Sequence, residues 1–268
     1  YVKDGGSWRT VFTLFDTPGS FTTAGSGTTS FTVPSNANAI HIEQAVGGGA
    51  GGVTGAEYDK AGGESAGAAG GSGAFISDRV YTVVGGELLT AVVGTGGGKS
   101  TGSAYNTTAG SGQATSLTGA STGPIFSLGG GVGGSASGGG VQGPLRSNNN
   151  GSGGIATLGS SLSSGTTVDG VNITTFTSGE VGTFNSGGDG VAGTNPGNCG
   201  GDNCSITGGV GGASYNGNVL GGAGGVASSS AGGDGSQGSG AGGGGAQNQT
   251  SGGDGGAGEM KYRFIRIA

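Results

Sequence analysis

The chain has 268 residues, of which 75 are glycine, and a formal net charge of −6 with only 9% charged residues. This balance excludes the basic surface that binds nucleic acid or an anionic membrane. Hydrophobic residues make up 31% of the chain, so a conventional apolar core can occupy only part of it. No apolar run approaches the length that predicts a membrane-spanning helix.

The N-terminal region is predicted to be β-structure. Short runs of aromatic and β-branched residues occur at residues 11–15, 21–23 and 28–33, and Pro18 and several glycines separate them. Residues 39–46 alternate apolar and polar side chains, which predicts a half-buried strand. No stretch of the chain has the apolar periodicity of a helix.

Two further segments and the C-terminus are expected to join this β-structure. Residues 74–84 and 88–93 are rich in β-branched residues and flank the pair Gly85 and Gly86, so they predict a hairpin. Residues 260–267 place apolar and aromatic residues on one face and basic residues on the other. This strand is expected to close the same sheet.

Many glycines follow a three-residue rhythm of two glycines and one other residue. Such tracts are found at residues 47–53, 129–135, 208–213, 221–226 and 252–257. A polyglycine II helix, which has polyproline II geometry, has three residues per turn and no internal hydrogen bonds. Because buried amides must be paired, these helices are stable only when packed side by side, with the third residue of each turn facing outward. We expect at least six of them, and expect residues 242–245 to be enclosed on all sides.

The alternative interpretation of the glycine content is a disordered linker or fibroin-like material. Ordering each glycine costs backbone entropy at the upper end of about 1–2 kcal/mol, so an isolated tract is not expected to fold. Several tracts packed together can offset this cost. The regular period of three favours the packed bundle.

Between residues 94 and 258, insertions with most of the aromatic, asparagine and proline residues of this region alternate with the tracts. They are expected to form loops at the tract ends. In one insertion Cys199 and Cys204 enclose four residues, which favours a tight disulfide, with two free thiols as the alternative. Two sulfurs and one distant histidine are too few for a structural zinc site, so neither a metal nor a cofactor is expected.

Motifs that suggest chemistry are weak here. Residues 94–100 (GTGGGKS) lack the spacing and following helix of a phosphate loop. GxSxG patterns are expected by chance in such a chain, and His41, in a strand with Glu43, is the single histidine available as a base. The recurring GGDG lacks the second carboxylate of calcium-binding repeats, which predicts solvated aspartates. The chain is therefore not expected to be an enzyme.

The order of motifs resembles a known family. FTVP (31–34), a strand, GGGAGG (47–52), GGELLTAVVGTGGG (85–98), further tracts and a final basic and aromatic strand are similar to the glycine-rich domain of bacteriophage tail-fibre and adhesin proteins. The similarity extends from about Phe21 to the end. The opening residues 1–11 resemble a short β motif common in phage tail proteins.

This resemblance implies an extracellular place at the tail-fibre tip of a virion. The implied partners are a host outer-membrane protein or surface glycan and other tail-fibre chains, with no nucleic acid. Fibres of this class are commonly homotrimers, whereas some tips are single chains seated on a trimer, and both arrangements stay open.

The expected fold is mostly irregular and all-β. A small antiparallel β domain combines the N-terminal region with the C-terminal strand, and a packed bundle of polyglycine II helices carries loops at its ends. Residues 1–20 are assigned to a connector that continues from a fibre, residues 21–98 and 259–268 to a β-rich base, and residues 99–258 to the bundle.

Receptor binding is expected on the loops, because recognition draws on aromatic residues, arginine and adaptable amides. The candidate residues are Arg146, Asn148, Phe176, Phe184, Asn195 and Tyr215. The alternative is that the aromatic residues only cover the tract ends. Two other functions remain open: an ice-binding polyglycine II protein, or a passive glycine-rich structural protein of a virion or cell surface.

Overall fold

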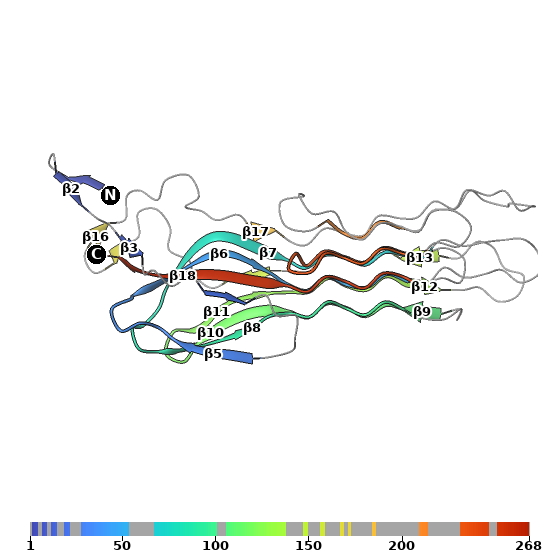
Figure 1. Ribbon diagram of the computed structural model, residues 1–268, viewed down its shortest axis with the longest axis horizontal. Coiled ribbons are helices and arrows are strands. Elements are labelled where there is room, and N and C mark those ends of the chain that lie inside the picture. Colours follow the sequence, from blue (N-terminus) through green and yellow to red (C-terminus); the bar gives the residue numbers. More distant parts are fainter. Residues whose placement is uncertain are drawn as a thin grey trace, which may run out of the picture.

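The computed structural model is an all-β protein in which a β-sandwich and a bundle of extended glycine tracts follow one another along the long axis (Figure 1). The structure describes residues 2–4, 7–9, 12–14, 19–21, 28–53, 67–100, 106–137, 147–149, 156–158, 167–168, 171–172, 184–185, 209–213, 231–246 and 251–267. Among these residues there is no α-helix, 3₁₀-helix or π-helix.

The first sheet of the sandwich has the strand order β17-β7-β6-β18-β3, and β4 also pairs with β18. Its strands are β3 (Phe12–Leu14), β4 (Gly19–Phe21), β6 (Ala39–Val46), β7 (Phe75–Thr82), β17 (Phe184–Asn185) and β18 (Glu259–Ile267). All pairings are antiparallel. The expected strand at residues 39–46 and the C-terminal strand are confirmed, and they are direct neighbours.

The second sheet has the strand order β14-β11-β10-β8-β5 and is also antiparallel. Its strands are β5 (Thr28–Thr32), β8 (Leu88–Val92), β10 (Thr115–Gly119), β11 (Gly123–Leu128) and β14 (Ala156–Leu158). The expected hairpin of residues 74–84 and 88–93 is wrong, because β7 and β8 belong to different sheets. Gly86, with a φ of 83°, lies in the turn that carries the chain from one sheet to the other.

The hydrophobic core lies between the two sheets. Both contribute fully buried side chains, including Ile40 and Met260 from the first sheet and Leu89 and Leu117 from the second. Phe31 of β5 stacks on Tyr262 of β18 with ring centroids 4.8 Å apart. This aromatic contact joins the early and late parts of the chain across the core.

Three smaller sheets complete the described structure. One has the order β13-β12-β9 and contains β9 (Asn106–Thr108), β12 (Ser135–Ser137) and β13 (Ser147–Asn149). The others are the pair β1 (Val2–Asp4) with β2 (Ser7–Arg9) and the pair β15 (Thr167–Val168) with β16 (Val171–Asn172).

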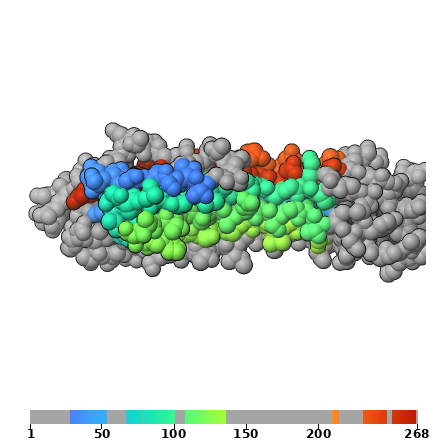
Figure 2. Space-filling view, turned by 90° about the horizontal axis from the view of Figure 1, so that it is seen from below, coloured from blue at the N-terminus to red at the C-terminus, as the bar shows by residue number. Residues whose placement is uncertain are grey.

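The long strands of the sandwich pass directly into glycine tracts. We number the tracts in chain order: tract 1 (47–53), tract 2 (67–74), tract 3 (94–100), tract 4 (109–114), tract 5 (129–134), tract 6 (209–213), tract 7 (231–236), tract 8 (241–246) and tract 9 (251–258). β6, β8 and β11 lead into tracts 1, 3 and 5, whereas tracts 2, 4 and 9 lead back into β7, β10 and β18. In the space-filling view the sandwich and the bundle accordingly form one elongated body (Figure 2).

Sandwich and bundle therefore alternate along the chain. The sequence assigned residues 21–98 to the base and residues 99–258 to the bundle. In the structure tracts 1 and 2 are part of the bundle, and β10 and β11 are part of the sandwich. We call the end of the bundle opposite the sandwich the far end.

Tract 1 donates its backbone hydrogen bonds with a period of three. Residues 47, 50 and 53 donate to tract 2, residues 48 and 51 to tract 4, and residues 49 and 52 to tract 9, with N···O distances of 2.8–3.0 Å. The direction of donation thus turns by a third of a circle per residue, which is the geometry of a helix with three residues per turn. Tract 1 accepts in turn from tracts 3, 5 and 8.

The tracts form a hexagonal lattice with tract 1 at its centre. Its six neighbours bond to one another in the cyclic order 2-8-9-3-4-5 and back to 2, so the ring is closed. Tract 6 lies against tracts 2 and 8, and tract 7 against tracts 8 and 9. Neighbours in the ring alternate in direction, since tracts 1, 3, 5 and 8 run away from the sandwich and the others return.

These observations confirm the polyglycine II bundle. No tract glycine has a φ in the positive region, so the helices have the left hand of polyproline II. Nine tracts are described, against the expected minimum of six. Tract 8, which contains residues 242–245, is buried throughout and bonds to five neighbouring tracts.

The lattice spacing explains the glycine content. A Cβ on Gly49 would lie 2.0 Å from the Ala241 carbonyl oxygen, and one on Gly52 would lie 2.0 Å from that of Gly244. At positions facing outward, side chains are tolerated: Val132 and Val210 are 48% and 40% exposed. On outer tracts the third residue of a turn can thus lie on the outer surface, as expected. In central tract 1 the expectation is wrong, because its third residues, Ala50 and Val53, are fully buried.

Candidate functional site: the far end of the bundle

The three-stranded sheet lies at the far end of the bundle (Figure 1). β12 continues tract 5, β9 leads into tract 4, and β13 pairs with β12 so that Asn148 lies opposite Ala136. The polyglycine helices thus change back into a β-ladder where the Gly-rich rhythm ends. This sheet fixes the backbone of one candidate residue, Asn148, at the far end.

Four connecting segments both begin and end at the far end. They are residues 54–66, 101–105, 138–146 and 247–250, and their flanking residues belong to tracts or to the far-end sheet. Val53, for example, donates to Ala68 at 2.8 Å and accepts from Ala246 at 3.0 Å. The lattice thereby brings the flanks of segments that are distant in sequence to one end of the molecule.

The structure does not bring all the candidate residues together. Asn148 lies at the far end, whereas Phe184 is in β17 and pairs with Ile76 of β7 in the sandwich. Arg146 and Phe176 lie outside the described residues. Arg146 is in the segment 138–146 and directly precedes β13.

The remaining candidates also lie outside the described residues. Asn195 and the expected disulfide of Cys199 and Cys204 are in a segment that starts after β17 and ends at tract 6. Tyr215 follows Ala213, whose carbonyl oxygen accepts a hydrogen bond of 2.7 Å from Ser72 Oγ toward the sandwich end of tract 2. The chain therefore enters the segment of Tyr215 from the sandwich side.

One far-end segment was missed by the sequence analysis, which placed it in the base. Residues 54–66 contain Tyr58, Lys60 and three acidic residues, and they connect tract 1 with tract 2. The signal was present, because the GGGAGGV tract at residues 47–53 precedes this segment directly. A loop between two tracts must lie at a tract end.

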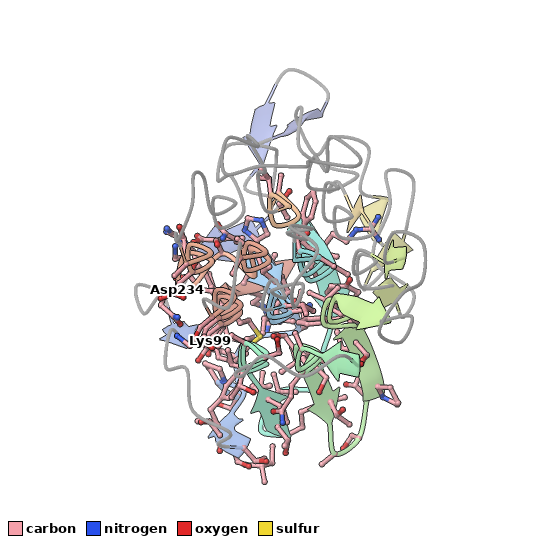
Figure 3. The ribbon with its side chains drawn as sticks, turned by 90° about the vertical axis from the view of Figure 1, so that its right-hand side faces the viewer. Lys99 and Asp234 are labelled. Atoms are coloured by element: carbon pink, nitrogen blue, oxygen red, sulfur yellow. The ribbon has the colours of Figure 1, made fainter. Side chains whose placement is uncertain are left out.

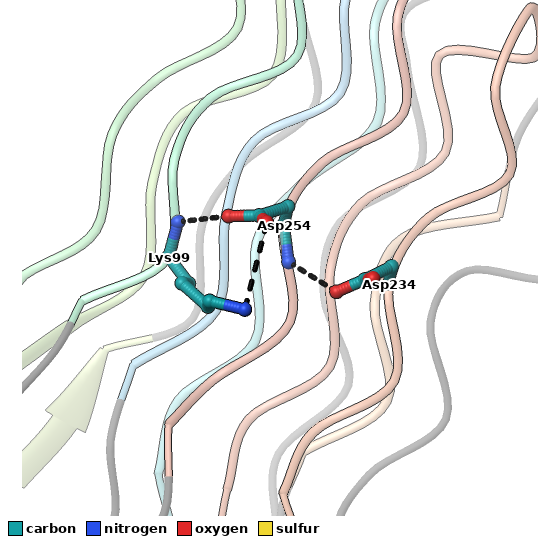
Figure 4. Close-up of polar contacts among 3 residues, drawn as sticks. All are labelled: Lys99, Asp234 and Asp254. Carbon is teal, nitrogen blue, oxygen red and sulfur yellow. Dashed lines mark hydrogen bonds and ion pairs between the residues drawn. The ribbon is translucent and has the colours of Figure 1, made fainter.

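Charged side chains gather on one flank of the bundle, formed by tracts 3, 9 and 7 (Figure 3). Asp254 Oδ1 accepts a hydrogen bond of 2.8 Å from the Lys99 amide, and its Oδ2 lies 3.6 Å from Lys99 Nζ. The Asp254 amide in turn donates to Asp234 Oδ1 at 2.9 Å (Figure 4). These aspartates are on the outer surface, as expected, and they also bind backbone amides of a neighbouring tract.

The opposite end of the molecule contains a buried carboxylate. Glu87 accepts hydrogen bonds from the amides of Val84, Ser121 and Thr122 and from the Thr122 hydroxyl. Burial alone would raise its pKa, but these hydrogen bonds outweigh burial and lower the pKa of the carboxyl group. Glu87 thus joins the turn between β7 and β8 to the turn between β10 and β11.

The motifs tested for chemistry have structural roles where they are described. Residues 94–100 form tract 3, and Glu43 forms an ion pair with Arg263 on the neighbouring strand. Within the described ranges no group of three or more potential ligands could hold a metal ion. In the same ranges there is no helix long and apolar enough to cross a membrane.

Comparison with known proteins gives one family. The model of a glycine-rich domain matches residues 22–264, which include the sandwich strands from β5 to β17, most of β18 and all nine tracts. A search of curated proteins found no match. Since the matched region spans most of the sequence, the chain belongs to the glycine-rich domain family.

Proposed function

We propose that this chain is the receptor-binding tip of a bacteriophage tail fibre and that it attaches the virion to a protein or glycan on the surface of a bacterium. Two findings support the proposal: the order of its motifs resembles that of phage tail-fibre adhesins, and the chain belongs to the glycine-rich domain family. On this proposal the protein is extracellular, binds other fibre chains through its N-terminal side and performs no catalysis.

One observation carries the proposal: four connecting segments begin and end at the far end of a rigid lattice. A tract of seven residues spans about 20 Å at about 3.1 Å per residue, so the bundle holds these segments well away from the sandwich. Binding groups that a scaffold holds in place lose less entropy on binding than free chains.

The far-end segments have a composition suited to recognition. Tyr58, Tyr105 and Arg146 lie in them, and tyrosine and arginine are enriched among residues that dominate binding energy. Asn148 follows in the far-end sheet. We therefore place the receptor site on these segments and exclude from it Phe184, whose strand is part of the sandwich.

The test compares a replacement of far-end segments with a control replacement of a segment next to the sandwich strand β17. In the first, residues 54–66 and 138–146 are replaced by Gly/Ser sequences of equal length; in the control, residues 173–183, which end at β17, are replaced in the same way. Fluorescently labelled proteins are then incubated with a panel of bacterial strains, and bound protein is measured by flow cytometry.

We expect the unmodified chain and the control to bind the same strains and the far-end replacement to lose binding while keeping its melting temperature. Loss of binding in the control with full binding in the far-end variant would place the site elsewhere. Ice binding is tested separately by thermal hysteresis, and a clear hysteresis without cell binding would favour the antifreeze alternative.

A further inference from the structure

Among the tracts that the structure describes, tracts 3, 9 and 7 form an outer flank of the lattice, and the backbone amides of tract 9 show how this flank is satisfied. Its amides point in three directions with a period of three. Gly253 and Gly256 donate to tract 8, and Gly255 and Gly258 donate to tract 3. The amides of the remaining positions, 254 and 257, point away from the bundle centre, where a further tract would continue the lattice.

Side chains bind the outward amides on this flank. Asp234 Oδ1 accepts from the Asp254 amide at 2.9 Å, and Gln237 Oε1 accepts from the Ala257 amide at 3.3 Å. These two acceptors are three residues apart, as are the two amides. On tract 3 the outward amide of Lys99 is bound by Asp254 Oδ1 at 2.8 Å.

Without these side-chain acceptors, the outward amides of the flank would be unpaired. Such a flank would resemble the edge strand of a β-sheet, to which another chain can add by backbone hydrogen bonds. The tracts of a second copy have the same spacing and the same carbonyl positions, so they are the natural partner for such an edge. We propose that Asp234, Gln237 and Asp254 cap this flank, so that a polyglycine tract of a second copy cannot extend the lattice there.

The role depends on the acceptor oxygen, and neither charge nor the ion pair explains it. Gln237 is uncharged and binds an amide in the same way as Asp234. The side chains of Lys99 and Asp254 are 37% and 47% exposed, and ion pairs at such exposure contribute little stability. Asparagine in place of aspartate should therefore preserve the cap, because it keeps an acceptor oxygen.

The first experiment measures amide hydrogen exchange by NMR on the full chain. We expect the Lys99 amide to be protected and Asp254→Ala to raise its exchange rate about tenfold or more, as expected for loss of a hydrogen bond to a charged group. Gly97 and Ser100, which donate to tract 1, are the internal controls and should not change. An unprotected Lys99 amide in the unmodified chain, or an unchanged rate in Asp254→Ala, overturns the cap.

The second experiment measures self-association by sedimentation velocity over a concentration series. The double variant Asp234→Ala/Asp254→Ala should associate, whereas Asp234→Asn/Asp254→Asn should behave as the unmodified chain. Asp169→Ala/Asp202→Ala removes the same charge outside the tracts and is the matched control. The proposal is contradicted if the double alanine variant at positions 234 and 254 does not associate. It is also contradicted if all three double variants associate equally.

A further variant keeps the test valid if the double alanine variant does not fold. Gln237→Ala removes one acceptor and no charge, and it should speed exchange at Ala257 and increase association. Exchange at Ala257 that stays as in the unmodified chain overturns the proposal without reference to folding. This result is independent of receptor binding, since the capped flank lies along the side of the bundle.

Discussion

Glycine is important in this lattice because it has no side chain, so the backbones of neighbouring tracts can approach closely. Gly49 and Gly98 both lie in polyglycine tracts, and neither has a positive φ. A Cβ on Gly49 would meet a carbonyl oxygen at 2.0 Å, whereas one on Gly98 would meet nothing within 4 Å. The same residue type is therefore required at one position and replaceable at the other.

This difference gives a matched pair of substitutions. Gly49→Ala should destabilise the fold by about 3 kcal/mol or more, because backbone has to move to admit the methyl group. Gly98→Ala should stay within about 1 kcal/mol of the unmodified protein or be slightly stabilising, because alanine lowers the entropy of the unfolded chain. Urea unfolding measures both, and equal effects would show that packing does not decide the requirement for glycine.

Glu87 gives a residue-scale prediction about pH. Its folded-state pKa lies below the ordinary value of 4.5, so the carboxylate stabilises the fold above that value and the contribution is lost as pH falls through the folded-state pKa. Glu87→Gln should therefore lower the free energy of unfolding at neutral pH by about 1–3 kcal/mol. In strongly acidic buffer the difference should nearly vanish; a difference that is independent of pH would contradict this account.

At the scale of elements, strands with a period of two continue into helices with a period of three. Thr115 lies at this junction, where its hydroxyl donates to the Val46 carbonyl oxygen at 2.6 Å and accepts from the Gly94 amide at 2.9 Å. Three chain segments thus change conformation around one buried hydroxyl group. The rotational phase of each tract, which decides the neighbour that each amide faces, is set by the strand before or after the tract.

The phase can be tested by an insertion. One extra glycine between Gly48 and Gly49 turns the rest of tract 1 by a third of a turn, so that the amides of residues 49–53 face the wrong neighbours. We expect loss of cooperative thermal unfolding monitored by circular dichroism. An extra glycine within residues 54–66 is the control and should leave the transition in place.

The sequence predicted the strands and tracts more accurately than it predicted which strands pair with one another. The glycine period of three depends on the helical repeat of each tract alone, and it correctly predicted helices packed side by side. The hairpin of β7 and β8 was wrong, because alternating apolar residues show that a strand is half-buried and leave its partner open. The partner of β7 is set by tracts 1 and 2, which bring β6 and β7 together through the lattice.

At the scale of the whole molecule, the sandwich and the bundle are expected to unfold as one unit, because strands and tracts share the same chain segments. Leu117→Ala in the sandwich core should destabilise the fold by about 2–5 kcal/mol. The amide of Gly51, deep in the bundle, should then lose the same free energy of protection in hydrogen exchange. Unchanged protection of Gly51 would show that the bundle is stable without the sandwich.

The candidate site was only partly predictable because its location depends on the arrangement of the whole molecule. Composition identified the loops, but which of them share an end depends on the direction of every tract, and this follows from the lattice. Asn148 and Phe184 both looked like loop residues, yet their strands lie in different parts of the molecule. Residues 54–66 begin and end at the far end because tract 1 runs away from the sandwich and tract 2 returns to it.

The orientation of the hydrogen bonds has a mechanical consequence. In the lattice the N–H···O bonds run between neighbouring tracts, across the long axis of the molecule. A tensile force between the far end and the sandwich therefore loads many of these bonds at once in shear, instead of opening them one after another. We therefore expect a high unfolding force when the molecule is pulled from its far end, because backbone hydrogen bonds in every tract share the load.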